Sequence, residues 1–257
     1  MPDRQQILDH LVGMSHALGN PTREWVILGE GNTSARIGEE SFFVKASGTH
    51  LGSITDKGFV EVQFEGILAL LAQQSLSGDE IEAGLAAARV DPACGLRPSV
   101  ETFLHARALS AGAATFIGHT HPAVVNAILC SRSAEAAFSG RIFPEEVVVC
   151  GPAPVFVPFT DPGLPLARAV WAGVEKHADL YGQWPRVLLL QNHGLITFGQ
   201  TAQEVVDTMA MAVKVSQVLL GTYTLGGPHF LPDQEVVHLH TDPVEAYRRR
   251  MLGMSTQ

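Results

Sequence analysis

The chain has 257 residues, of which 46% are hydrophobic and 17% are charged, and its formal net charge is −9. This composition predicts a globular protein with a sizeable core, and the length is compatible with one large domain over residues 1–257. The negative charge argues against nucleic-acid binding, because backbone phosphates require clustered Lys and Arg. The basic cluster at 248–250 is interpreted as the solvated end of a helix.

Targeting and redox signals indicate a cytoplasmic protein. The sequence has no run of about 18 apolar residues, so neither a membrane helix nor a membrane partner is expected. Residues 1–14 lack the basic and apolar segments of a secretory signal. The three cysteines, an odd number, have no CxxC spacing, which favours reduced thiols.

The N-terminal third predicts alternating helices and strands. Apolar residues recur near a 3.6-residue period over residues 5–18, which is typical of an amphipathic helix. WVILGEGNTSARI (25–37) predicts a strand, a glycine turn and a second strand, and SFFVKASGTH (41–50) predicts another strand that ends in a turn. Residues 64–74 have a helical pattern, and residues 87–99, rich in Pro and Gly, predict a long loop.

The rest of the chain continues this alternation. In chain order, the further predicted elements are a helix at 98–112, a strand at 114–121, a helix at 123–130, strands at 145–150 and 153–159, a helix at 166–180, two strands within 186–199, and a helix at 202–220. The intermixed strands and helices favour an α/β fold class.

Two histidines stand one residue apart in FIGHTHPAVV (116–125). Residues i and i+2 of a strand project from the same face, so His119 and His121 can converge on one point. Neutral imidazoles are good ligands for Zn²⁺. An HxH pair alone is a weak signal, and the second pair, His238 and His240, is interpreted as surface because no further chemical feature accompanies it.

A third histidine, His193 in LLLQNHGLI, follows another apolar run and precedes a glycine turn. Alone it is more typical of a hydrogen-bonded core histidine than of a metal ligand. As a third donor it would complete a His₃ set that leaves one coordination position open, which is typical of catalytic zinc. Mn²⁺ or Co²⁺ could occupy the same site.

Charged residues near position 100 have more than one interpretation. Glu101 lies in the first turn of the helix predicted at 98–112, where a carboxylate also suits the helix dipole. His105 shares the helix face of Glu101 and is interpreted as a surface residue, with a supporting role behind the site as the alternative. Arg97 is interpreted as a surface arginine, with recognition of a carboxylate as the alternative.

Two turns of small residues, GEGNTS (29–34) and KASGTH (45–50), each follow an apolar run. Such turns can aim several N–H groups at an anion. Neither matches a P-loop or a dinucleotide fingerprint, and by themselves such turns are more often plain hairpin turns.

Taken together, GEGNTS, KASGT, PSVE, GHTHP and NHG, in this order, resemble the class II aldolase/adducin family over residues 5–225. That family includes L-fuculose-1-phosphate and rhamnulose-1-phosphate aldolases, epimerases, dehydratases and decarboxylases. The resemblance implies a single three-layer α/β/α domain with a largely antiparallel central sheet covered by helices. It also implies a homo-oligomer, commonly a tetramer.

The resemblance also implies roles for individual residues. His119, His121 and His193 would bind the metal, and Glu101 would be the proton donor and acceptor. The residues implied to contact the substrate's phosphate or its equivalent are Gly31, Asn32, Ser34, Ser47, Gly48 and Ser99. Val100 stands where fuculose aldolases have a second serine, so one hydroxyl of the anion pocket is missing.

The implied function is a metal-dependent aldolase-type lyase. It would cleave a carbon–carbon bond of a ketose 1-phosphate or related hydroxy-carbonyl sugar through a metal-bound enediolate. The epimerase branch has Asp at the position of Glu101, so the longer acid favours a lyase. The alternatives are a decarboxylase of a sugar acid or hydroxy acid using the same site, and a non-catalytic adducin-like interaction module, which would be expected to lack the ligand residues.

Overall fold

The computed structural model describes residues 3–254, and within them seven strands form one sheet in the order β3-β2-β1-β4-β7-β6-β5. The strands are β1 (Asn32–Arg36), β2 (Ser41–Lys45), β3 (Phe59–Gln63), β4 (Phe116–Thr120), β5 (Val155–Val157), β6 (Val187–Leu190) and β7 (Gly194–Gly199). Edge strand β5 pairs with β6 in parallel, and the other pairings are antiparallel. The α/β class is confirmed, and the sheet is mixed, although mostly antiparallel.

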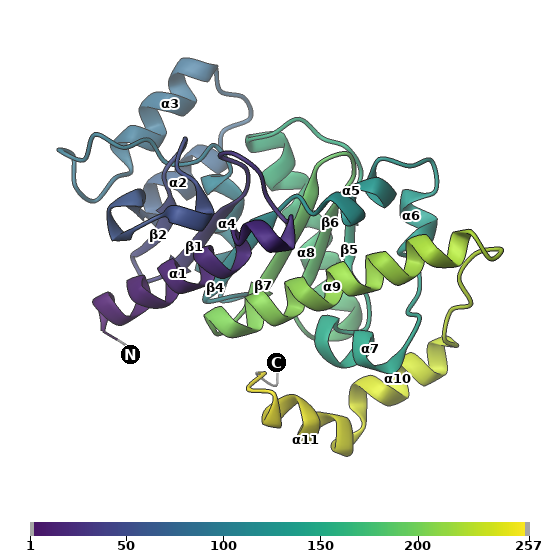
Figure 1. Cartoon of the computed structure of the whole chain (residues 1–257). Coiled ribbons are helices and arrows are strands. Elements are labelled where there is room, and N and C mark those ends of the chain that lie inside the picture. Colours follow the sequence, from purple (N-terminus) through teal and green to yellow (C-terminus); the bar gives the residue numbers. More distant parts are fainter. Residues whose placement is uncertain (1–2, 255–257) are drawn as a thin grey trace.

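Helices cover both faces of the sheet (Figure 1). The helices are α1 (Arg4–Leu18), α2 (Phe64–Leu71), α3 (Gly78–Ala87), α4 (Thr102–Ser110), α5 (Ala123–Leu129), α6 (Ala134–Ala137), α7 (Pro144–Cys150), α8 (Leu164–Tyr181), α9 (Ala202–Tyr223), α10 (Asp233–Thr241) and α11 (Pro243–Met251). Helices α1 and α9 cross one face, whereas α4 and α8 lie on the other.

Strand alternation divides the apolar residues between two cores. Neighbouring residues of a strand point to opposite faces. On β2, Phe43 belongs to the core beneath α1 and α9, and Phe42 belongs to the core beneath α4 and α8. On β7, Leu195 and Ile196 divide in the same way. The sheet is therefore buried on both faces.

Helix α9 is long and apolar enough to span a membrane by length and composition. It contacts β7 and β4, and half of its most apolar 18-residue window is buried within the protein. Thr201 caps its first turn, accepting from the backbone N–H of Glu204, whose side chain accepts in return from the N–H of Thr201. We therefore interpret α9 as a helix of the protein core, packed on one face of the sheet.

Two predicted strands are wrong. Residues 25–28 form no strand, because Leu28 has a left-handed backbone (φ 52°) and Ile27 and Leu28 are exposed. Residues 145–150 form helix α7 instead, which Pro144 opens with a backbone φ suited to a helix. Residues 146–150 are all buried, so α7 lacks the one-sided pattern that identifies a helix.

The C-terminal basic cluster is not a fully solvated helix end. The Arg249 side chain is largely buried and donates to the His240 carbonyl (2.9 Å). Arg248 is half exposed and pairs with Glu245 (3.0 Å). On α10, His238 is exposed, as expected, whereas His240 is only partly exposed.

Candidate active site

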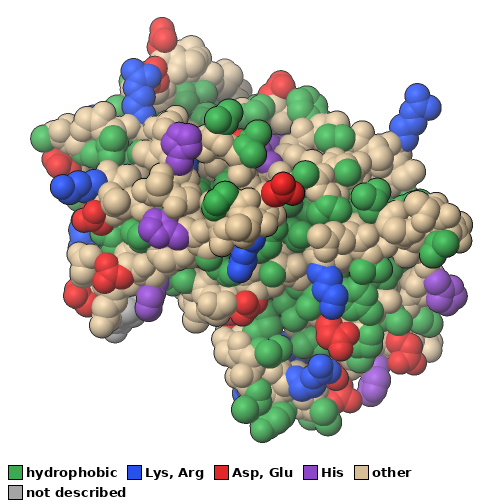
Figure 2. Space-filling model, viewed as in Figure 1, with side chains coloured by type: hydrophobic (Ala, Val, Ile, Leu, Met, Phe, Trp, Pro, Cys, Tyr) green, Lys and Arg blue, Asp and Glu red, His purple; other side chains and the backbone are tan. Residues whose placement is uncertain are grey.

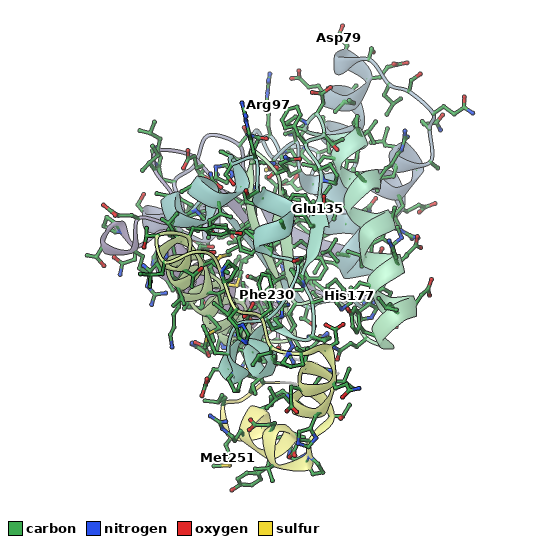
Figure 3. The ribbon with its side chains drawn as sticks, turned by 90° about the vertical axis from the view of Figure 1, so that its right-hand side faces the viewer. Asp79, Arg97, Glu135, His177, Phe230 and Met251 are labelled. Atoms are coloured by element: carbon green, nitrogen blue, oxygen red, sulfur yellow. The ribbon has the colours of Figure 1, made fainter. Side chains whose placement is uncertain are left out.

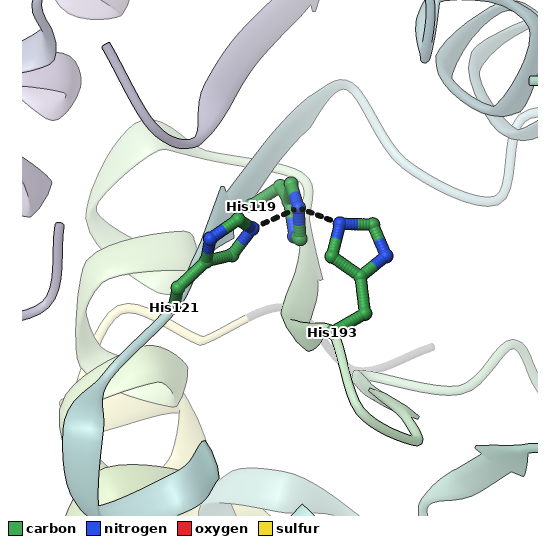
Figure 4. Close-up of side chains that lie close together, drawn as sticks. All are labelled: His119, His121 and His193. Atoms are coloured by element: carbon green, nitrogen blue, oxygen red, sulfur yellow. Dashed lines mark hydrogen bonds between the residues drawn. The ribbon is translucent and has the colours of Figure 1, made fainter. Parts of the chain in front are cut away.

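Three imidazoles meet where β4 ends and β7 begins (Figure 4). Because β4 and β7 are antiparallel, the end of β4 that carries His119 lies beside the first residues of β7. The β6–β7 turn carries His193 to the same point, with Asn192 in a left-handed conformation (φ 55°). His121 follows β4 directly.

The ring nitrogens converge. The Nε2 atom of His119 lies 2.9 Å from Nε2 of His121 and 3.3 Å from Nε2 of His193. The Nδ1 atom of His119 faces the carbonyl of Leu195 (3.0 Å), which only accepts, so in the neutral ring the proton is on Nδ1. The Nε2 lone pair of His119 therefore points at the other two rings. This donor set suits a divalent cation such as Zn²⁺, because all three imidazoles can present bare nitrogens to one centre.

Close backbone approaches hold this arrangement. A Cβ on Gly31, which has φ of +69°, would lie 2.5 Å from the carbonyl oxygen of His119. A Cβ on Gly194 would lie 2.6 Å from the ring of His121. The Asn126 side chain donates to the carbonyl of His193 (3.0 Å). Both glycines are therefore required by space, and they position the histidine backbone.

Glu101 lies directly against the histidines. Its Oε1 is 3.2 Å from Nε2 of His193, and its Oε2 is 3.5 Å from Nε2 of His119. It was predicted in the first turn of a helix and is instead the N-cap residue, one position before α4 begins, and its carboxylate is largely buried. The site thus combines three imidazoles with one carboxylate.

A chain of buried hydrogen bonds fixes that carboxylate. The Asn32 amide donates to Oε2 of Glu101 (2.5 Å), which leaves the amide oxygen to accept from Nε2 of His105 (2.5 Å). Nδ1 of His105 must then accept, and the Ser34 hydroxyl donates to it (2.6 Å). His105 is fully buried, so its interpretation as a surface residue is wrong. Its spacing of one helical turn from Glu101 was the available sequence signal.

Burial keeps the imidazoles neutral. It lowers the pKa of His121 to about 4 and that of His105 to about 3, and it also lowers the pKa values of His119 and His193. Burial alone would raise the pKa of Glu101, but His119, His193 and the Asn32 amide outweigh it and lower the pKa to about 2. Near pH 7 the site therefore presents neutral ligands beside an anion, the protonation states that a bound cation requires.

The predicted anion-pocket residues fall into two groups. Ser47, Gly48 and Ser99 come together, because the Ser47 N–H donates to the carbonyl of Arg97 and the Ser99 N–H to that of Lys45. Ser47 and Gly48 are exposed and Ser99 partly so. The second group is Gly31, Asn32 and Ser34, of which Asn32 and Ser34 are buried on β1. Ser34 has no exposed surface with which to contact a ligand, and both polar groups of the Asn32 side chain are engaged.

Lys45, which the motif analysis did not single out, is a buried cation at the end of β2. Its side chain is 2% exposed, and its Nζ donates to the carbonyl of Gly29 (3.2 Å). Burial lowers the pKa of Lys45, and the negative charge of Glu101 opposes that shift. A lysine at the end of a buried strand and the start of KASGT was the signal available in the sequence. Arg97 is exposed and pairs with Glu82, so its surface interpretation is confirmed.

The family of this fold and site can now be stated. Residues 9–220 match the family described as Class II Aldolase and Adducin N-terminal domain. The match covers most of the chain, and the chain therefore belongs to this family.

Two proteins with similar sequences have different names and are matched over different shares of their length. The chain is 29% identical over 206 residues to the uncharacterized oxidoreductase YuxG of Bacillus subtilis (strain 168), a match that covers 76% of this chain but only 27% of that protein. It is 28% identical over 193 residues to the methylthioribulose-1-phosphate dehydratase of Geobacillus kaustophilus (strain HTA426), covering 71% of this chain and 77% of the relative.

Solved structures share the fold. The L-fuculose 1-phosphate aldolase from Glaciozyma antarctica PI12 superposes with a TM-score of 0.63 at 17% identity, covering 97% of this chain and 91% of that one. At this identity the likeness establishes a common fold.

Proposed function

We propose that this protein is a metal-dependent lyase that cleaves a carbon–carbon bond of a hydroxy-carbonyl sugar. The convergence of His119, His121 and His193 beside Glu101 carries this proposal. The three histidines would hold Zn²⁺, with Mn²⁺ or Co²⁺ as alternatives. An adducin-like module without catalysis would have no need for this set, and every member of it is present.

The bound metal would supply Lewis-acid stabilisation for negative charge that develops on a carbonyl oxygen of the substrate. Glu101 would move the proton at the neighbouring carbon, since its carboxylate lies against the metal-binding histidines and is an anion at neutral pH. Asn32 and His105 would hold that carboxylate in one orientation. Because Glu101 is largely buried, few water molecules would compete for the proton.

The anionic end of the substrate would bind where the turn after β2 meets the segment before α4. Ser47 and Ser99 offer hydroxyl groups there and Gly48 its N–H, and Lys45 adds a buried positive charge nearby. Val100, in place of a second hydroxyl, leaves this pocket able to take a phosphate or a carboxylate with fewer hydrogen bonds.

Dehydration is a second candidate, favoured by the identity to the Geobacillus dehydratase. Both reactions need a group that moves a proton at the carbon next to the carbonyl. Dehydration removes a proton from that carbon, whereas cleavage adds one there after the carbon–carbon bond has broken, and the leaving groups differ. An aldehyde leaves in cleavage and a hydroxyl in dehydration, whereas CO₂ would leave in a decarboxylation. Product analysis on one substrate panel separates the three.

We also propose a homo-oligomer, with a tetramer as the expected order. Hydrophobic side chains gather over α10 and α11 (Figure 2). Exposed apolar residues of these helices are Val237, Val244, Tyr247 and Met251. An apolar surface of this kind is typical of subunit interfaces.

The test is a zinc-loaded protein assayed against ketose 1-phosphates and sugar acids for aldehyde, water loss and CO₂. His119→Ala should lose both zinc and activity, and Glu101→Gln should keep zinc while kcat falls by a factor of about 100 or more. His10→Ala, at an exposed position of α1, is the matched control. Cleavage that persists in the metal-free His119→Ala variant would contradict the proposal.

A further inference from the structure

A cavity that none of the three histidines lines lies between α3 and the segment from Arg89 to Val100. Its volume is about 370 Å³, within the range of pockets that bind small molecules. The apolar side chains that line it are Ile81, Leu85, Leu96 and Val100. Arg89 and Arg97 add two positive charges to this lining, and Glu82 one negative charge.

The walls of the cavity are fixed by Arg89. Its Nε donates to the carbonyl of Ala86 at the end of α3 (2.9 Å). Its Nη1 donates to the carbonyls of Cys94 and Leu96, on the opposite wall. One guanidinium therefore ties the loop to the helix, so the cavity is part of the fold and not a gap beneath a free loop.

Arg97 lies at the solvent side of the cavity. Its side chain is 75% exposed and pairs with Glu82 of α3, itself 57% exposed, at 2.8 Å. Figure 3 shows Arg97 at the same end of the molecule as Asp79, the second residue of α3. An ion pair this exposed adds little stability, so a ligand carboxylate can take the place of Glu82.

The cavity is continuous with the proposed anion pocket. Ser47 belongs to both, and its N–H donates to the carbonyl of Arg97. Val100, which is 46% exposed, lines the cavity and directly precedes Glu101 in the chain. A molecule bound at Ser47 can therefore extend across Val100 into the apolar part of the cavity.

We propose that this cavity binds an apolar chain that ends in a carboxylate, as the non-reacting end of a hydroxy-carbonyl acid; a simple ketose 1-phosphate has no such end. The apolar part would pack on Ile81 and Leu85, and the carboxylate would pair with Arg97. The identity of this ligand as part of the substrate rests on the proposed function, whereas the ligand chemistry rests on the cavity itself.

Binding of 4-phenylbutyrate and of its uncharged amide, measured by calorimetry on the zinc-loaded protein, tests the cavity. The acid should bind about threefold more tightly than the amide, because a solvent-exposed ion pair with Arg97 adds to the same apolar contact. Arg97→Gln should remove this preference. Glu82→Gln should increase the affinity for the acid by about threefold, because the Glu82 carboxylate no longer competes for Arg97. The opposite directions of the two variants distinguish ligand recognition from general loss of structure.

Gly95→Leu supplies the steric test. Gly95 lines the cavity, and a Cβ there would meet no atom within 4 Å, so the leucine can fill the space without backbone strain. This variant should lose binding of both probes while keeping the melting temperature of the parent. Unchanged binding in Gly95→Leu, or equal affinity of the parent for acid and amide, would overturn the proposal.

Enzyme kinetics test separately whether the ligand of this cavity is part of the substrate. In a cleavage assay, 4-phenylbutyrate should raise KM and leave kcat unchanged, and an unchanged KM would overturn the assignment to the substrate. If the protein shows neither zinc nor cleavage but the binding pattern holds, the proposed function fails and the cavity assignment stands. If cleavage occurs without probe binding, only the cavity assignment fails and the proposed function stands.

Discussion

The amide nitrogen of Asn32 lies 2.5 Å from Oε2 of Glu101, although 69 residues separate them in the sequence. Asn32 opens β1, which pairs with β4 so that Asn32 stands opposite His119. The same strand pairing therefore brings the carboxylate's hydrogen-bond donor to the metal-binding histidines. His105 and Ser34 extend this contact into the core.

Breaking this series of hydrogen bonds at Ser34 should impair the site without removing a metal ligand. Ser34→Ala leaves Nδ1 of His105 without its donor, which should cost about 1–3 kcal/mol of stability. Because the His105 ring then keeps only one of its two hydrogen bonds, kcat should fall by about tenfold to a hundredfold with zinc content and KM preserved. The acid limb of the pH–rate profile should also move upward as Glu101 loses support.

Ser139→Ala, at an exposed position, is the control for this variant. If Ser34→Ala lowered stability but left both kcat and the pH profile as in the parent, Ser34 would be structural only.

A methyl group at Gly31 should displace His119. Gly31 has φ of +69°, and the added Cβ would lie 2.5 Å from the carbonyl oxygen of His119. Gly31→Ala should therefore lower the free energy of unfolding by more than about 1 kcal/mol and weaken zinc binding. Gly13→Ala on α1, where nothing lies within 4 Å, should stabilise the protein by about 0.5–1 kcal/mol. Denaturant unfolding and zinc titration compare the two variants, and equal zinc affinity would contradict this role of Gly31.

Replacing the buried cation at position 45 should weaken binding of an anionic substrate. Lys45→Met keeps the length of the side chain and removes its charge, so KM should rise by about tenfold with a smaller effect on kcat. The matched control is Lys57→Met, at an exposed position. Steady-state kinetics on charged and neutral substrates measure the effect, and the same KM in both variants would argue against an anion pocket at Lys45.

Acid should destabilise the metal-free protein through His105. Burial lowers the pKa of His105 from 6.5 to about 3, so the unfolded chain binds a proton more readily than the folded one between these values. The contribution of His105 to stability is thus complete above pH 6.5 and is lost as the pH falls toward 3. Within this window the titration of His105 lowers the free energy of unfolding by up to about 1.4 kcal/mol for each pH unit of acidification. Urea unfolding from pH 7 to 4 should show a shallower slope in His105→Phe, and an unchanged slope would contradict the buried neutral state.

The metal-binding histidines could be predicted from the sequence, whereas the residues and elements around them were predicted less well. His119, His121 and His193 could be selected because histidine is costly in an apolar run and each stands at the end of one. His105 was misjudged because its helix spacing fits both a surface and a buried face, and only the packing of α4 against β1 distinguishes them. Helix α7 was misjudged because a run of buried valines has the same pattern in a strand and in a helix. The cavity beside α3 depends on how a loop folds back, which no local pattern encodes.

X-ray absorption at the zinc edge, on the purified zinc-loaded protein, tests the central claim most directly. We predict three imidazole nitrogens at about 2.0–2.1 Å and one further light atom, with the imidazole signal reduced in His193→Ala. Sulfur ligands at about 2.3 Å, or a spectrum that His193→Ala leaves unchanged, would show that the metal binds elsewhere and would contradict the proposed active site.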